Sequence, residues 1–305
     1  YNGVISGMSM DGGRFFYPNP LSSDGKYAFN ADNTKTRQPW FGCACCPSNL
    51  CRFIPSVPGY LYGVKDNNIY VNLFAGNTST IKVQGKDVVL EETTEYPWNG
   101  DIKISVKKSG VKNANLLVRI PGWVRNQVVP SDLYKYSDAE KPAYTVTVNG
   151  KAVEADLDAN KGYLPVKNIK KGDVIRIHFD MPIRTVVANN KVADDKGKVA
   201  VERGPLVYCA EAVDNNNEPV LRAVMAKKPT FTLVDNYSIQ NTETKGAPAF
   251  SVKAIKTDAQ VLEEGANGIS VKNDKLTLIP YYAWNHRGAN EMNVWFIQSL
   301  SMLDK

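Results

Sequence analysis

The sequence predicts a mainly all-β protein, and two observations carry that prediction. From about residue 66 onward, apolar and polar residues alternate over short runs, as they do along strands that bury one face. Turn sequences rich in Gly and Asn, such as Asn149-Gly150 and Lys171-Gly172-Asp173, separate these runs. Repeated short strands joined by such turns are typical of antiparallel sandwiches and barrels.

Four runs show the alternation clearly and are predicted as strands: 68–74, 102–106, 144–148 and 174–179. Because one sandwich takes about 100 to 150 residues, the region is predicted to form two consecutive antiparallel β-sandwich domains. Their predicted ranges are 66–188 and 189–305. The boundary is placed in the polar loop that follows Ala188, and Lys198-Val199-Ala200-Val201 would open the second domain.

Residues 1–65 differ from the rest, because they are rich in Gly, Asn and aromatic residues. They contain one helical candidate, which follows a cluster of cysteines. Pro47 suits the first helical position, and apolar residues then recur at helical spacing. Pro55 and Pro58-Gly59 are expected to end this helix.

The overall composition excludes several classes of protein. With 43% hydrophobic and 22% charged residues, the chain of 305 residues is globular rather than disordered. It has no run of about 18 apolar residues that could span a membrane. The net charge of +6 is scattered, which argues against nucleic-acid binding. The chain opens on Tyr1 without a signal-peptide pattern, so we expect it to start inside a longer protein.

The cysteines are clustered in a way that argues against a disulfide framework. Four of the five lie within nine residues, as Cys43, Cys45, Cys46 and Cys51. Cys209 lies alone in an apolar run and is predicted to be a buried core thiol.

The adjacent pair Cys45-Cys46 has several chemical interpretations. Adjacent cysteines rarely bridge each other, so they are metal ligands, a nucleophile beside a ligand, or a pair without function. Zn²⁺ and the N-terminus of the following helix would both favour thiolate. A closed zinc knuckle is an alternative, although the spacing Cys-x-Cys-Cys-x4-Cys differs from the usual Cys-x2-Cys pairs. Cys43 and Cys51 could be bystanders, and spacing alone leaves these alternatives open.

The segment Trp40-Phe41-Gly42-Cys43-Ala44-Cys45-Cys46-Pro47-Ser48-Asn49 resembles the signature of glycoside hydrolase family 127, the β-L-arabinofuranosidase group. Further segments resemble the family in order and spacing over nearly the whole chain: 15–21, 58–62, 96–100, 119–123, 148–150, 162–163, 203–208 and 279–287.

The resemblance implies a catalytic (α/α)6 barrel followed by two β-sandwich domains. Residues 1–65 would then be the C-terminal tail of that barrel, including the Cys-Cys-Pro motif. It also implies that Cys45 is the nucleophile and a zinc ligand and that Cys46 is a second zinc ligand. The other two ligands, from a Glu-x-Cys motif, and the acid/base glutamate would lie upstream. Because the first glutamate of this chain is Glu91, we expect the chain alone to lack them and to be inactive.

The implied reaction is retaining hydrolysis of β-L-arabinofuranosides or related plant-glycan sugars. A zinc-bound Cys45 thiolate would attack the anomeric carbon and form a thioglycosyl intermediate, while a glutamic acid assists departure of the leaving group. Tyr17 is a weaker candidate for a substrate contact, and a purely structural aromatic is an equally good interpretation. Periplasmic and cytoplasmic locations are both compatible with this function.

Other residues are interpreted as structural. His178 and His286 are expected to have no catalytic role, and Glu202 and Glu211 need not face one site. Four tryptophans are interpreted as sandwich core or interdomain packing rather than as a sugar-stacking platform: Trp98, Trp123, Trp284 and Trp295. Two alternatives to a hydrolase remain. One is a non-catalytic module that binds carbohydrate or forms a homodimer through a β-sandwich, and the other is a structural zinc protein.

Overall fold

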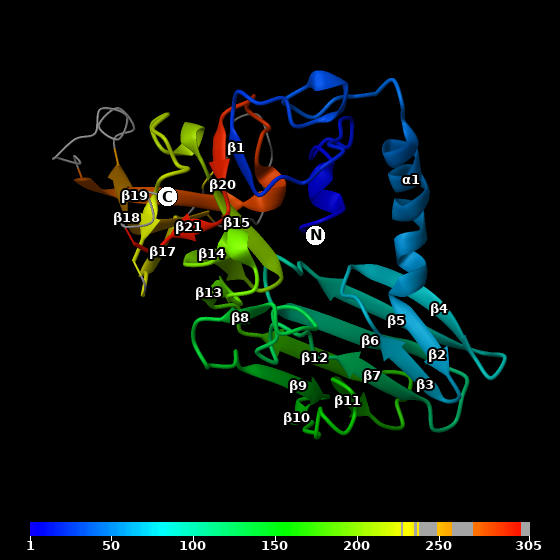
Figure 1. Ribbon diagram of the computed structural model, residues 1–305. Helices are drawn as coiled ribbons and strands as arrows, with labels where there is room; N and C mark the ends of the chain where they lie inside the picture. The colour runs from blue at the N-terminus through cyan, green and yellow to red at the C-terminus, as the bar shows by residue number, and fades with distance from the viewer. Residues whose placement is uncertain (227, 235–236, 238–248, 258–270, 300–305) are drawn as a thin grey trace. The chain divides into compact units, whose positions relative to one another are not determined.

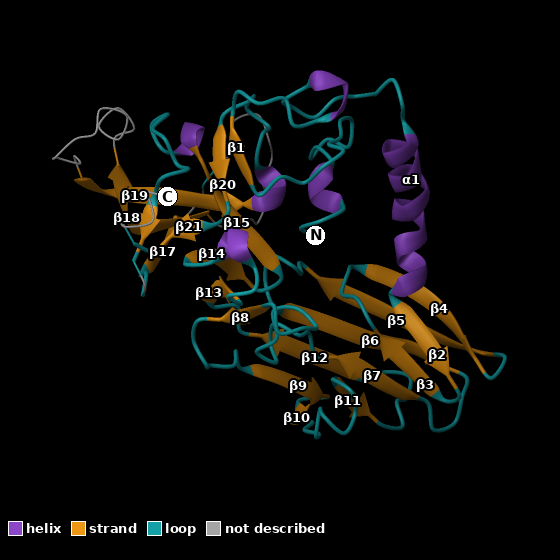
Figure 2. Ribbon diagram, in the orientation of Figure 1, coloured by secondary structure: helices purple, strands orange, loops and turns teal. Residues whose placement is uncertain are grey.

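The structure is a computed structural model that describes residues 1–226, 228–234, 237, 249–257 and 271–299 (Figure 1). Strands are its main elements, and after residue 65 the helices in the described ranges are all short 3-10 turns (Figure 2). The prediction of a mainly β protein with several antiparallel sheets is therefore confirmed. None of the helices in the described ranges is long and apolar enough to cross a membrane.

The chain divides into two compact units, and each of them is built from segments that are separated in the sequence. Unit 1 comprises Tyr1–Leu50, Ser131–Asp138 and Ile183–Lys305, and unit 2 comprises Cys51–Pro130 and Ala139–Pro182. The loop in which the sequence places a domain boundary joins β13 (Ile183–Ala188) to β14 (Lys198–Arg203). These two strands pair with each other inside unit 1.

The helix α1 (Cys45–Phe53) lies where the sequence predicts a helix, and the 3-10 helix η3 (Ile54–Tyr60) follows it directly. Helix α1 begins two residues before Pro47, so Pro47 occupies the third position of that helix. Because the first four N–H groups of a helix have no partner within it, the missing N–H of proline costs nothing there. The pair Cys45-Cys46 is thereby placed in the first turn of the helix.

Unit 2 contains two sheets, and several of their strands alternate buried with more exposed residues, as predicted. One has the order β10-β9-β12-β6-β5-β4, and all its pairings are antiparallel. The other has the order β11-β7-β3-β2 and includes a parallel pair, β3 with β7. Their bounds are β2 Tyr62–Lys65, β3 Asn68–Val71, β4 Asn77–Val83, β5 Lys86–Thr94, β6 Asp101–Ser109, β7 Asn115–Arg119, β9 Tyr144–Val148, β10 Lys151–Ala152, β11 Tyr163–Val166 and β12 Val174–Phe179.

An aromatic cluster contributes to the core of unit 2. The Phe179 ring is 5.7 Å from that of Phe74, 5.8 Å from that of Trp123 and 6.5 Å from that of Tyr96, measured between centroids. Burial of one such large apolar side chain contributes about 1.5–3 kcal/mol to folding. Gly100 fits beside Phe179 only because it lacks a Cβ atom, which would lie 1.9 Å from the Phe179 carbonyl oxygen.

Unit 1 has its described strands in one sheet, whereas the sequence predicts two facing sheets for most of this region. The order is β1-β20-β15-β19-β18-β16-β21-β14-β13-β8, with β17 beside β18. A further pairing of β15 with β14 closes six of these strands into a ring. The new bounds are β1 Ser22–Asp24, β8 Tyr134–Tyr136, β15 Leu206–Glu211, β16 Val224–Met225, β17 Phe231–Val234, β18 Ala249–Thr257, β19 Val271–Pro280, β20 Glu291–Asn293 and β21 Phe296–Ile297.

The ring surrounds a buried apolar cluster. The strands β16 and β21 are only two residues long and pair in parallel, so no periodicity in the sequence marks them. The cluster consists of Val199, Val201, Leu206, Tyr208, Ala210, Val220, Ala223, Met225, Ala254, Leu276, Leu278 and Phe296.

The first 44 residues contain little regular structure and are held in unit 1 by aromatic packing. The Phe16 ring stacks on that of Trp284, with centroids 5.2 Å apart, and Phe29 lies 5.7 Å from Trp284. The Arg37 guanidinium lies 4.3 Å from the centroid of the Phe16 ring. Arg37 also donates hydrogen bonds to the backbone oxygens of Ser6 (2.9 Å) and Trp284 (2.6 Å). The segment before the cysteines is therefore anchored to the end of the chain.

Candidate functional site

The thiols of Cys45 and Cys46 lie together at the first turn of α1, and both side chains are exposed. Their sulfur atoms are 3.7 Å apart. Two thiolates bound to one tetrahedral zinc at about 2.3 Å would have their sulfurs about 3.8 Å apart. The distance between the two sulfur atoms is therefore close to the distance expected between two of the four ligands of a tetrahedral zinc ion.

The two thiols differ in their acidity. Interaction with the Cys46 thiol lowers the pKa of Cys45, and contacts with Tyr17 and Cys43 lower it further, against the opposing effect of partial desolvation. Interaction with the Cys45 thiol raises the pKa of Cys46, and partial desolvation adds to that effect. Cys45 is therefore the member of the pair that ionises first, which suits a nucleophile.

Tyr17 is brought next to Cys45 by the fold. Its backbone N–H donates to Asn30 Oδ1 at 2.9 Å, and its ring meets that of Phe41 edge-on, with centroids 4.6 Å apart. Its hydroxyl is buried, and besides Cys45 it has no hydrogen-bond partner in the described part of the chain. Burial and the nearby Cys45 thiol raise the pKa of Tyr17 to about 12, so the hydroxyl stays protonated beside the sulfur.

The loop before the cysteines is fixed by a side chain ten residues earlier. Asp32 Oδ2 accepts a hydrogen bond of 2.8 Å from the Gly42 backbone N–H. Asp32 itself has a φ of 54°, in the left-handed region that few residues other than glycine adopt. Next to Gly42, the Phe41 side chain is only 1% exposed. These contacts set where α1 begins and hence where Cys45 lies.

The other cysteines occupy different environments. Cys43 is exposed and interacts with Cys45, whereas Cys51 is exposed in the second half of α1. Cys209 is fully buried, as predicted, and burial raises the pKa of its thiol. Among the described residues, no three His, Cys, Asp or Glu side chains are arranged to hold a metal ion.

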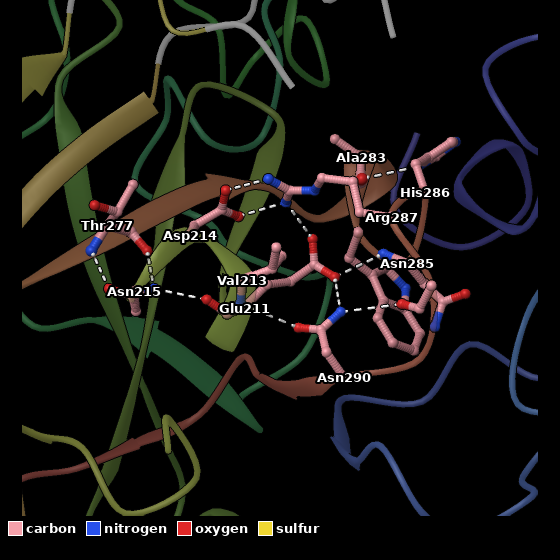
Figure 3. A network of polar contacts seen from close by, with 12 residues as sticks. Glu211, Val213, Asp214, Asn215, Thr277, Ala283, Asn285, His286, Arg287 and Asn290 are labelled. Carbon is pink, nitrogen blue, oxygen red and sulfur yellow. Dashed lines mark hydrogen bonds and ion pairs between the residues drawn. The ribbon is translucent and has the colours of Figure 1, made fainter. Parts of the chain in front are cut away.

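A buried charged network in unit 1 was not predicted from the sequence (Figure 3). Glu211 is fully buried and forms an ion pair of 2.7 Å with Arg287, which also pairs with Asp214. Glu211 Oε1 accepts hydrogen bonds of 2.9 Å from the Asn285 backbone N–H and from Asn290 Nδ2. The Arg287 side chain is part of the 279–287 segment, but nothing in that segment indicates which carboxylates it meets.

Glu202 and Glu211, which the sequence does not require to face one site, have different partners. Glu202 accepts a hydrogen bond of 3.0 Å from the Tyr136 hydroxyl, and burial raises the pKa of Glu202 to about 7. Glu211 instead belongs to the Arg287 network, and its pKa is raised by burial.

The two histidines also lie in different surroundings. His178 is exposed in unit 2 between Asp101, 2.7 Å away, and Asp180, 3.1 Å away, and the hydrogen bond to Asp101 raises the pKa of His178. His286 lies in unit 1, where its Nδ1 is 2.8 Å from the Ala283 backbone oxygen. Burial lowers the pKa of His286 to about 4.

The tryptophans are only partly in the core. Trp123 and Trp284 are buried, and Trp295 is half-buried against Tyr134, with ring centroids 5.7 Å apart. Trp98 is 39% exposed and therefore does not lie in the core. It lies in the turn after β5, where the alternating pattern that marks buried positions has ended.

Three sequence models of one family match the chain in succession. They are the GH127 catalytic domain of β-L-arabinofuranosidase over residues 1–59, the GH127 middle domain over 68–181, and the glycoside hydrolase family 127 C-terminal domain over 183–297. Together they match most of the chain.

Proteins and structures similar to the chain carry related names. A non-reducing end β-L-arabinofuranosidase of Bifidobacterium longum subsp. longum is 32% identical over 309 residues, which cover 97% of this chain and 44% of that protein. The structure of a GH127 β-arabinofuranosidase is 47% identical, with a TM-score of 0.85, over 97% of this chain and 44% of that one. A GH127 β-L-arabinofuranosidase from Geobacillus stearothermophilus T6 is 31% identical, with a TM-score of 0.78 and the same coverage. The chain spans less than half the length of each of these relatives.

Proposed function

Because the chain belongs to glycoside hydrolase family 127, we propose that it is the C-terminal portion of a retaining hydrolase that cleaves β-L-arabinofuranosides or related plant-glycan sugars. The relatives named above are β-arabinofuranosidases, which supports this substrate class. The single observation that carries the proposal is the pair of thiols at the start of α1, with sulfurs 3.7 Å apart and the pKa of Cys45 lowered.

In this proposal Cys45 is the nucleophile. Its thiolate attacks the anomeric carbon, so that a C–S bond forms while the bond from that carbon to the leaving oxygen breaks. A carboxylic acid protonates the leaving oxygen and later removes a proton from the water that displaces the sulfur. Two displacements at one carbon retain its configuration. The chain has no glutamate before Glu91, so we assign this acid/base role to a residue outside residues 1–90.

Cys46 and Cys45 would together hold a zinc ion, which would keep both thiols ionised at neutral pH and make the sulfur a better leaving group. The spacing of the sulfurs and the softness of thiolate donors fit this metal. The other two ligands would come from groups that the described residues do not bring to the cysteines.

Tyr17 is proposed to position and polarise the nucleophile and to contact the sugar. Its hydroxyl stays protonated and lies beside the sulfur of Cys45. A donor at that place stabilises the thiolate before attack and again when the C–S bond breaks. The ring of Phe41 holds the Tyr17 ring, so the direction of the hydroxyl is fixed by packing.

The rest of the chain would support this site. We assign residues 1–65 to the end of a helical catalytic barrel, consistent with the match of residues 1–59 to the catalytic-domain model. The two sheets of unit 2, with the Phe74 and Phe179 rings in its core, would form a β-sandwich.

The experiment that tests the function follows the stereochemistry of hydrolysis. The full-length protein, loaded with zinc, is incubated with p-nitrophenyl β-L-arabinofuranoside, and the first-formed sugar is followed by proton NMR. We expect nitrophenol release and a product that is initially the β anomer. An initial α anomer, or no hydrolysis with zinc bound, would refute the proposed reaction.

A further inference from the structure

Unit 1 contains a cavity that the proposed chemistry of Cys45 does not use. Its volume is about 400 Å³. That is near the lower end of the range for small-molecule sites in proteins, about 300–1,000 Å³, so it suits a monosaccharide or disaccharide. Its walls come from two parts of the chain that are far apart in sequence, and they consist of Ser9, Met10, Asp11, Arg14, Thr36, Arg37, Asn285, His286 and Gly288.

One wall carries a buried acceptor without a partner. Asn285 is only 5% exposed, and its Oδ1 atom accepts no hydrogen bond within the described part of the chain. Its Nδ2 group donates to the Lys35 backbone oxygen at 3.1 Å, which fixes the orientation of the amide. A buried carbonyl oxygen without a donor is unfavourable, so a ligand hydroxyl that donated to it would stabilise the bound state.

The backbone holds Asn285 firmly in this position. Its φ of 60° lies in the left-handed region, where asparagine is one of the few tolerated residues. Its N–H donates to Glu211, which is itself paired with Arg287 (Figure 3). Unusual backbone conformations that the surrounding structure enforces occur often at ligand sites. The acceptor is therefore preorganised.

The next residue, His286, contributes an uncharged surface. Its Nδ1 is 2.8 Å from the Ala283 oxygen, and its Nε2 lies 3.1 Å from the Met10 backbone nitrogen, which donates to it. Both ring nitrogens are thus engaged by the backbone. The neutral ring and the Met10 side chain are apolar surface against which the carbon atoms of a sugar could pack.

The segments 9–14 and 36–37 supply charged groups of both signs to the wall. Asp11 closes the loop 9–14, because its Oδ1 accepts hydrogen bonds from the Ser9 hydroxyl and from the Gly13 N–H at 3.0 Å. Arg14 interacts electrostatically with the Asp11 carboxylate. Arg37 is buried and directs its donors to backbone oxygens. Asp11 and Arg14 therefore balance each other at the cavity.

We propose that this cavity is a second, non-catalytic carbohydrate site that takes a neutral pentose or pentose disaccharide. An amide oxygen, a carboxylate and a guanidinium provide acceptors and donors for adjacent hydroxyl groups, and the His286 ring provides the apolar contact. The balanced charge favours a neutral polyhydroxyl ligand over an anion. The choice of a pentose rests on the proposed function, whereas the site itself does not depend on Cys45.

The Met10 methyl group permits a test that reports on this cavity alone. The protein is labelled with ¹³C at its methionine methyls, and the Met10 signal is assigned from a Met10→Leu variant. We expect titration with L-arabinose to shift the Met10 signal saturably in the millimolar range and to leave the signal of Met225, buried in the core of unit 1, unchanged. No shift of the Met10 signal up to the highest soluble concentration would overturn the proposal.

Two variants and a control separate specific binding from general effects. Arg14→Met keeps an exposed aliphatic side chain and Asp11→Asn keeps the loop-closing Oδ1, so both should fold. Each should weaken binding of L-arabinose at least fivefold, whereas Arg176→Met, an exposed change in unit 2, should not alter it. Equal affinity in all variants would contradict the proposal. So would a Met10 shift with sodium acetate or inorganic phosphate but not with arabinose, because it would identify an anion site.

The outcome is independent of the hydrolase proposal. Binding at Met10 without hydrolysis would leave a carbohydrate-binding module, and hydrolysis without binding at Met10 would remove only the second site.

Discussion

The sulfur atoms of Cys45 and Cys46 lie 3.7 Å apart in the first turn of one helix, and each thiol shifts the pKa of the other in opposite directions. Adjacent residues in a helix point about 100° apart, so such closeness is not expected of exposed neighbours. The Pro47 that follows leaves the first turn intact, because that turn needs no internal N–H donor.

Zinc binding by the chain alone should be weak. The described residues supply two thiol donors at the right spacing, but no group of three His, Cys, Asp or Glu side chains arranged to hold a metal ion. We expect metal analysis of the 305-residue chain after dialysis against micromolar zinc to find well under one zinc per chain. Stoichiometric zinc that is lost in Cys43→Ser or Cys51→Ser would instead support a closed zinc knuckle.

Replacement of Tyr17 by phenylalanine should make Cys45 less acidic. The Tyr17 hydroxyl is one of the groups that lower the pKa of Cys45, so its removal should raise that pKa. The rate at which iodoacetamide alkylates Cys45 is measured against pH on zinc-free protein, and mass spectrometry identifies the alkylated residue. The pH profile of this rate should therefore shift to higher pH in the variant. Tyr27→Phe is the matched control, because Tyr27 is 73% exposed. Identical pH profiles for the two variants would contradict the assigned role.

The change Arg287→Met should strongly destabilise unit 1. It leaves the fully buried Glu211 carboxylate, and Asp214 beside it, without their cation. Removal of one partner from a buried ion pair typically costs about 3–5 kcal/mol. Urea unfolding followed by circular dichroism should show this loss, whereas the exposed Arg176→Met should change stability by less than about 0.5 kcal/mol. A loss as small as that of the control would show that the network does not hold the fold.

Glu92 should make the stability of unit 2 depend on pH. It is buried, accepts hydrogen bonds from the Tyr62 hydroxyl (3.1 Å) and the Ala75 N–H (3.0 Å), and burial raises its pKa from 4.5 to about 7. The folded state therefore binds the proton more tightly than the unfolded state. Stability from this residue is complete below pH 4.5 and is lost as the pH rises toward 7.

The corresponding variant is Glu92→Gln, which can keep both hydrogen bonds without the charge. In the unmodified protein, Glu92 should lower the free energy of unfolding by about 2–3 kcal/mol between pH 4.5 and 7, and this decrease should be absent in the variant. Unfolding is followed through the fluorescence of Trp98 and Trp123 in unit 2. Unchanged pH dependence in the variant would mean that Glu92 is not the titrating group.

Local patterns made much of this fold predictable. The strands β6, β9 and β12 lie where alternation places them, and α1 lies where Pro47 and apolar spacing place it. The strands β16 and β21 could not be predicted, since two residues carry no period. Nor could the ring that they close, because it depends on pairings between distant segments.

The candidate site was predictable only as far as sequence neighbours reach. Cys45 and Cys46 are adjacent in the chain, so their pairing was visible at once. The contact of Tyr17 with Cys45 crosses 28 positions and depends on Phe41 and Asn30, which no pattern marks. The cavity beside Asn285 joins segments more than 240 residues apart, and only the folded chain shows it.

The most direct test of the central claim is the activity of Cys45→Ser in the full-length, zinc-loaded protein. Hydrolysis of p-nitrophenyl β-L-arabinofuranoside should fall at least about a thousandfold, because a serine hydroxyl is far less ionised than the Cys45 thiol. Cys51→Ser, an exposed change in the same helix, should retain the activity of the unmodified protein. If Cys45→Ser hydrolyses the substrate as fast as Cys51→Ser does, Cys45 is not the nucleophile.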